Sequence, residues 1–126
     1  MEYSERILKP LPDGLAHIVR RLSEKPTVKN VEVISDQIIK VFRKGFKNDL
    51  LIYVVDAYSL GDGDTYEIIS KHPDIDAILL LSNWNEYSSK AKALAKERKV
   101  GLFTYNEMMG AIYYFGEKFI NYQPKE

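Results

Sequence analysis

The sequence predicts a three-layer α/β domain in which helices cover both faces of a mixed β-sheet. Three continuously apolar runs, at 50–55, 77–81 and 100–103, indicate central strands that are buried on both faces. Helical patterns separate these runs, so we expect parallel strands joined by right-handed crossovers. The length of 126 residues, 45% of them hydrophobic, is typical of one globular domain with one core. We therefore expect residues 1–126 to form a single domain.

The chain is expected to begin with an extended lead-in and a helix. Residues 1–12 contain Pro10 and Pro12, which favour extended backbone. A helix is predicted from Asp13 until Pro26, because apolar residues recur there at helical spacing, at Leu15, Ile18, Val19 and Leu22.

Two antiparallel strands are expected between this helix and the first apolar run. Valines alternate with a polar residue at 31–33, and β-branched residues are frequent at 37–42. Ser35 and Asp36 mark the turn between these strands. Turn-forming residues at 45–49 then lead into the third strand, so the sheet should be antiparallel in its first half and parallel in its second.

Helices are expected after each of the three apolar runs, over 65–70, 86–99 and 105–119. Each follows a favourable N-cap residue that precedes a glutamate by three positions, namely Asp64, Asn83 and Thr104 before Glu67, Glu86 and Glu107. The lysines of the 86–99 helix, Lys92 among them, are expected on its solvated face. Residues 121–126 form a tail.

The composition excludes several classes of protein. There is no cysteine, so the chain holds no disulfide, thiolate zinc site or thiol nucleophile. The first residues lack the profile of a signal peptide, and no apolar run is long enough to span a bilayer. We therefore expect a cytoplasmic protein without a membrane partner. The net charge is zero, whereas a non-specific nucleic-acid binder is usually basic overall.

The carboxyl ends of the three predicted parallel strands form the expected ligand-binding edge of the sheet. Trp84, the only tryptophan, either stacks on a base or ring there or covers the neighbouring helix. The loop 59–65 contains glycines but matches neither a P-loop nor an EF-hand, and its two aspartates would repel phosphate. We interpret this loop as a turn and a helix cap. The candidate ligand-binding residues at this edge are Asp62, Asp64, Asn83, Trp84, Asn85 and Tyr105.

Two further features are interpreted as structural. His17 and His72 lack the spacing of metal ligands. The aromatic residues of the last helix, at 113–115 with Phe119 and Tyr122, are too apolar for full exposure. We expect them in the core or in a homodimer surface.

The order of elements, with a helix, three strands and then alternating helices and strands, resembles the restriction-endonuclease-like superfamily. The nearest members are the Mrr-type and Holliday-junction-resolvase-like nucleases. The stretch 78–85, followed by Ala91 and Ala95 and then by 100–103, is similar to that family's ending of strand, Ser-Asn, helix of small residues, glycine and strand. The resemblance covers about residues 13–110.

This resemblance implies a magnesium-dependent nuclease site, with an acid at the second strand and an acid-x-Lys pair on the third. The acids of that family hold Mg²⁺, which activates water and stabilises charge on the phosphodiester. In this chain Asp36 matches the first acid and Asp56 the second, as candidate catalytic and metal-binding residues. Tyr58 stands where the family has its lysine. In an active member, Lys40 or Lys71 would have to replace it.

Several functions remain open at this point. The first is a catalytically degenerate nuclease-like module that binds nucleic acid or a protein partner without a cofactor, with Asp36, Asp56 and Tyr58 as vestiges. The second is an active Mg²⁺-dependent DNA endonuclease. The third is a Rossmann-like module that holds a nucleotide or another small ligand across the strand-end loops. A plain oligomerisation domain, pairing through the Tyr-rich last helix, is a fourth.

Overall fold

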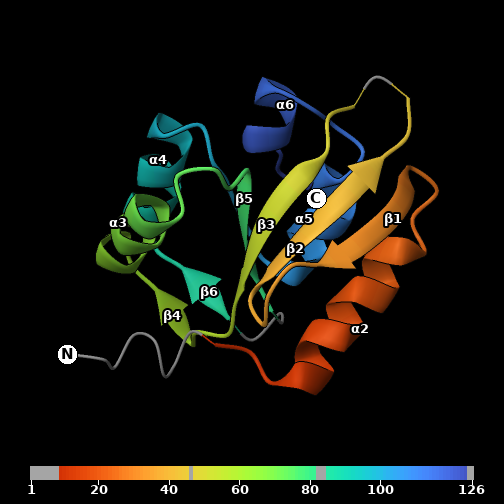
Figure 1. Ribbon diagram of the computed structural model, residues 1–126. Helices are drawn as coiled ribbons and strands as arrows, with labels where there is room; N and C mark the ends of the chain where they lie inside the picture. Colours follow the sequence, from red (N-terminus) through yellow and green to blue (C-terminus); the bar gives the residue numbers. More distant parts are fainter. Residues whose placement is uncertain (1–8, 46, 82–84, 125–126) are drawn as a thin grey trace.

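The computed structural model describes residues 9–45, 47–81 and 85–124. Its elements are arranged around one five-stranded sheet (Figure 1). The helices are α2 (Pro12–Ser23), α3 (Asp62–Lys71), α4 (Ser89–Glu97), α5 (Tyr105–Ala111) and α6 (Glu117–Ile120). The strands are β1 (Val28–Val33), β2 (Ile38–Arg43), β3 (Leu50–Val55), β4 (Ser59–Leu60), β5 (Ala77–Leu80), β6 (Glu86–Tyr87) and β7 (Gly101–Phe103).

The sheet is mixed, as the sequence predicts, with the strand order β1-β2-β3-β5-β7. Strands β1, β2 and β3 pair antiparallel, because each is joined to the next by a short turn. Strands β3, β5 and β7 pair parallel through the crossover helices α3 and α4. The carboxyl ends of β3, β5 and β7 therefore meet at one edge of the sheet, which we call the carboxyl edge.

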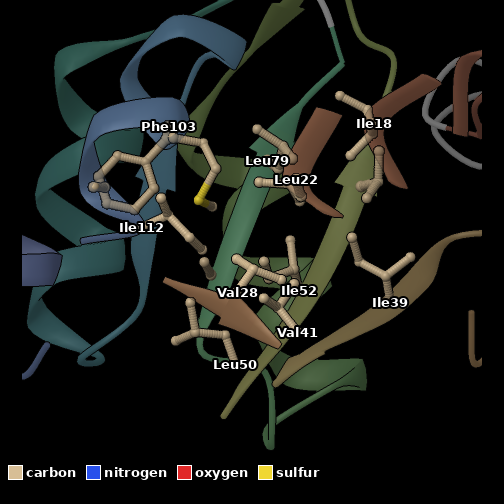
Figure 2. Close-up of a cluster of buried hydrophobic side chains, with 14 of the residues drawn as sticks. Ile18, Leu22, Val28, Ile39, Val41, Leu50, Ile52, Leu79, Phe103 and Ile112 are labelled. Atoms are coloured by element: carbon tan, nitrogen blue, oxygen red, sulfur yellow. The ribbon is translucent and has the colours of Figure 1, made fainter. Parts of the chain in front are cut away.

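Helices cover both faces of the sheet, so the molecule has three layers. Alternate residues of β3 point to opposite faces, and this is why its sequence is apolar throughout. On one face, β3 packs with α2, α5 and α6 in a core that includes Ile18, Leu22, Ile52 and Phe103 (Figure 2). On the other face, Ile78 and Leu102 pack against α3 and α4, which lie together in Figure 1.

Two predicted helix starts are wrong. Helix α3 begins at Asp62, earlier than predicted, with Gly61 as its N-cap; Asp64 lies inside the first turn, where its carboxylate accepts the Gly61 N–H at 3.3 Å. Helix α4 begins at Ser89, later than predicted, because residues 86–87 form β6 and pair with β4. Its N-cap is Ser88, whose Oγ accepts the Ala91 N–H at 3.0 Å. Asn83, the predicted cap, lies outside the described residues.

The predicted last helix is two helices. Its start is confirmed, since Thr104 and Glu107 form a reciprocal capping box. The helix ends at Ala111, and α6 begins only after Gly116, whose φ of +65° is in the left-handed region. The aromatic residues divide accordingly, because Phe119 is buried whereas the three at 113–115 are exposed in the connection. In the described part of the chain, no helix is long and apolar enough to cross a membrane.

Candidate functional site at the carboxyl edge

The carboxyl edge is built from the loops that follow β3 and β5. These loops are tied together by the parallel pairing of β4 with β6. The Glu86 N–H donates to the Tyr58 carbonyl at 3.1 Å, and the Ser88 N–H donates to the Leu60 carbonyl at 2.9 Å. The two loops therefore form one backbone-bonded structure beyond the strand ends, although they are far apart in sequence.

Asp56 and Asn85 come together at this edge. Asp56 is half-buried directly after β3, and the side-chain amide of the buried Asn85 lies 3.5 Å from its Oδ1. Tyr58 follows two residues later with 80% of its surface exposed. The sequence placed all three residues at the strand ends, and the structure agrees.

Asp36 lies at the same end of the sheet, because its turn leads into β2 beside the end of β3. The Val54 N–H donates to the Gln37 carbonyl at 2.7 Å, which fixes the register there. The carboxylate of Asp36 makes an exposed ion pair with Lys9, at 2.9 Å. It also borders a mostly apolar hollow of about 300 Å³ that is lined by Leu15 and Val33. The contacts of Asp36 are thus with the lead-in and the β1 side of the sheet.

The described acids at this edge are not gathered into a metal-binding group. Among the described residues there is no group of three His, Asp or Glu side chains that could hold a metal ion. The two lysines considered as replacements for the family lysine have other neighbours. Lys71 pairs with Glu67 at 3.1 Å, and the Lys40 ammonium lies 5.2 Å from the Phe42 ring.

The other predicted ligand-binding residues have separate roles or positions. Asp62 and Asp64 lie in the first turn of α3, where their negative charges stabilise the helix by interacting with the positive end of its dipole. Tyr105 begins α5 and contacts α2, because its hydroxyl accepts from Arg21 Nε at 3.0 Å and its ring stacks on His17. Asn83 and Trp84 lie outside the described residues. The prediction of a turn and a helix cap at 59–65 is thus correct only for the cap, since residues 59–60 form β4 and α3 begins at Asp62 after its N-cap Gly61.

Sequence reasoning missed a polar cluster beside β7, formed by the buried Lys92 and the half-buried Tyr87 and Glu107. Lys92 was expected on the solvated face of its helix, but only 9% of its surface is exposed. Its ammonium donates to the Leu102 carbonyl of β7. The Tyr87 hydroxyl donates to the Glu107 carboxylate at 2.9 Å, and that carboxylate also accepts the Thr104 N–H at 2.9 Å.

Burial perturbs the titration of this cluster. It lowers the pKa of Lys92 to about 8, although the negative charge of Glu107 opposes this effect. Burial also raises the pKa of Tyr87, and the hydrogen bond to Glu107 adds to the increase. Strand β7 is the outermost strand of the sheet, so its side away from β5 has no partner strand. Lys92 therefore donates to a backbone carbonyl, that of Leu102, which no other strand pairs with. The sequence held one signal for the burial of Lys92, which is that Ala91 and Ala95 lie near it on the helix. Their small side chains leave room for the lysine side chain to pack inward.

Comparison with known proteins gives no relative for this chain. No protein-family model, no curated protein and no solved structure matches it. The resemblance to the restriction-endonuclease-like superfamily therefore stays a prediction from the order of elements and the motifs.

Proposed function

We propose that this chain is a nuclease-like module that binds nucleic acid without cutting it. The observation that carries the proposal is Tyr58, which stands two residues after Asp56 at the end of β3 and is exposed to solvent. The resemblance requires a lysine at this place. A phenol brings no positive charge to a phosphodiester and cannot replace an ammonium group in orienting the attacking water.

The surroundings of the two acids support the same proposal. Asp36 has Lys9 as a counter-ion, and Asp56 has the amide of Asn85 as its neighbour. The Lys9 ammonium would compete with Mg²⁺ for the Asp36 carboxylate. The alternative of an active nuclease keeps one observation in its favour, which is that both acids lie at the same end of the sheet.

A cleavage assay separates the two functions. The protein is incubated with linear duplex, single-stranded and four-way-junction DNA in Mg²⁺ or Mn²⁺, and binding is measured separately in EDTA. We expect binding in EDTA and intact DNA with either metal. Cleavage by the native chain that is lost in Asp56→Ala but kept in Asp74→Ala, an exposed aspartate before β5, would overturn the proposal.

Two further measurements sharpen this test. The variant Tyr58→Lys restores the acid-x-Lys pattern, so cleavage that appears only in this variant would show that the tyrosine is what silences the site. Saturable quenching of Trp84 fluorescence by mononucleotides, without binding of any oligonucleotide, would favour the small-ligand function and contradict ours.

A further inference from the structure

The end of the sheet opposite the carboxyl edge carries a basic and aromatic surface. Helix α2 ends there, β1 begins there, and the β2–β3 connection and α6 lie at this end in Figure 1, whereas β4 and β6 lie at the other. The Lys44 N–H donates to the Thr27 carbonyl at 2.8 Å, which joins two of these segments. We call this surface the amino-end face, and it consists of Lys25, Lys44, Lys47, Lys118, Tyr113, Tyr114 and Phe115.

The three aromatic residues of the amino-end face are consecutive in sequence and exposed in the connection between α5 and α6. Tyr113, Tyr114 and Phe115 have 41%, 43% and 54% of their surface exposed. Because these rings are not buried in the core, their flat apolar faces are accessible to a ligand. The ring of Tyr122 lies 5.5 Å from that of Tyr114 and extends the aromatic surface.

A buried arginine holds this connection in place. Arg43, at the end of β2, is only 3% exposed, and its guanidinium donates to the carbonyls of Ile112 and Tyr114. The same group donates to the carbonyl of Asn48 at 2.8 Å and to its side-chain oxygen at 3.0 Å. The aromatic connection is thus fixed to the β2–β3 turn, so its rings are presented by a preorganised backbone.

Two of the lysines lie beside these rings. The Lys25 ammonium lies 5.9 Å from the Tyr113 ring centroid, and Lys118 borders an open hollow of about 660 Å³ that is also lined by Tyr114 and Tyr122. In the part of the chain that the structure describes, no ion pair involves any of the four lysines of this face. The chain segments that carry these lysines also carry three exposed acids, Glu24, Asp49 and Glu117, and Glu24 pairs with Arg21 at 3.4 Å, so the lysines exceed the acids in number only slightly.

We propose that the amino-end face binds single-stranded nucleic acid. Bases of any sequence can stack on exposed aromatic rings while lysines contact the phosphates. This inference rests on the proposed function for the kind of ligand but places it away from the nuclease-like edge. At that edge Asp36, Asp56 and the two aspartates of the first turn of α3 would repel phosphates.

A second copy of the chain fits the same surface less well. A two-fold contact between amino-end faces would bring the four lysines of one copy against those of the other, and such like charges disfavour association. The phosphates of a nucleic acid could instead form ion pairs with these lysines. Charge complementarity therefore selects the polyanion over the homodimer as the occupant.

The first test compares exposed aromatic residues at the two ends of the sheet. Binding of a fluorescein-labelled oligothymidylate is measured by fluorescence anisotropy in EDTA. Phe115→Ala should weaken binding by roughly 5- to 150-fold, the range expected for the loss of one stacked base. Tyr58→Ala, which removes an even more exposed ring at the carboxyl edge, should leave the affinity unchanged.

The second test uses the salt dependence of binding. Replacing Lys44 and Lys118 by glutamine should reduce the slope of log K against log salt by about 1.4, or about 0.7 for each lost phosphate contact. Lys90→Gln, at an exposed position of α4, is the matched control and should leave the slope unchanged.

The outcomes distinguish a wrong surface from a wrong function. If Tyr58→Ala weakens binding and Phe115→Ala does not, the nucleic acid lies at the carboxyl edge, and this inference fails while the proposed function stands. Equal affinity for duplex and single strands would also overturn it, because stacking requires unpaired bases. If no nucleic acid binds, both proposals fail. Dimerisation or vesicle binding that is lost in Phe115→Ala would then identify the true occupant.

Discussion

Replacing Lys92 by methionine tests the role of the buried ammonium beside β7. Methionine has a similar length and keeps the apolar contacts of the lysine stem, but it removes the charge and the hydrogen bond to the Leu102 carbonyl. The ammonium lies 4.4 Å from the Phe103 ring centroid in an environment poor in water. The substitution therefore changes how the stability of the fold depends on pH.

The sign and size of this dependence follow from the two pKa values of Lys92. Its pKa is about 8 in the folded protein and about 10.5 in the unfolded chain. Below pH 8 the amine is charged in both states, and the cost of burying the charge is fully present. As pH rises from 8 toward 10.5, the unfolded chain binds more protons than the folded one, so the free energy of unfolding increases. The difference corresponds to about 3 kcal/mol in total, of which about 2 kcal/mol is regained between pH 8 and pH 10.

Urea unfolding at a series of pH values measures this effect. We expect the free energy of unfolding of the native chain to rise relative to that of Lys92→Met by about 2 kcal/mol between pH 8 and pH 10. Lys96→Met, on the same helix but only half-buried, should follow the native curve. Parallel curves for the native chain and Lys92→Met would refute the reasoning. Above pH 10 the raised pKa of Tyr87 lowers the stability of both proteins, which limits the useful range.

Three substitutions and one control, Gly63→Ala, test individual contacts of the fold by urea unfolding. Gly101→Ala should destabilise by about 1–3 kcal/mol, because an added Cβ would lie 2.5 Å from the buried Phe103 ring, whereas Gly63→Ala meets no atom within 4 Å and should be tolerated. Arg43→Met should cost about 3 kcal/mol, since it leaves three backbone carbonyls without their donor. Thr104→Ala should cost about 1 kcal/mol through loss of the N-cap. If the free energy of unfolding falls by less than half the stated amount, the corresponding contact does not stabilise the fold as we argue.

The strands of the five-stranded sheet were predictable because their sequences record how they are buried, whereas β4 and β6 were not predicted. The run 50–55 is apolar at every position, and each of its faces is covered by a layer of helices. Short turns joined the first three strands and helical segments joined the last three, which was enough to predict where the sheet changes from antiparallel to parallel.

The helix boundaries were less predictable, because tertiary contacts competed with local signals. Asn83 and Glu86 have the spacing of a cap, yet Glu86 belongs to β6 and Ser88 caps α4 instead. The pairing of 86–87 with 59–60 decides this, and no local pattern contains both partners. Similarly, Gly116 allows the chain to turn before α6, where a continuous helical pattern was expected.

The carboxyl edge was located correctly, whereas the polar interactions around it were not. Asp56, Tyr58 and Asn85 reach the edge because they directly follow strands or pair with a strand-end loop, a position that can be counted along the sequence. The burial of Lys92 and Arg43 could not be predicted from their positions along the sequence. Each depends on carbonyl groups of residues distant in sequence, which the chain brings close only when it folds.

The sequence by itself determined the strands of the five-stranded sheet, their directions and the edge where three of them end, since apolar periodicity and connection length are local properties; it did not predict the β4–β6 pair. Only the tertiary structure decided which charges are buried, which helix starts are used and where lysines and aromatic rings gather. These features depend on contacts between segments that are distant in the chain. The energy of such a contact depends on both segments, so neither segment predicts it alone.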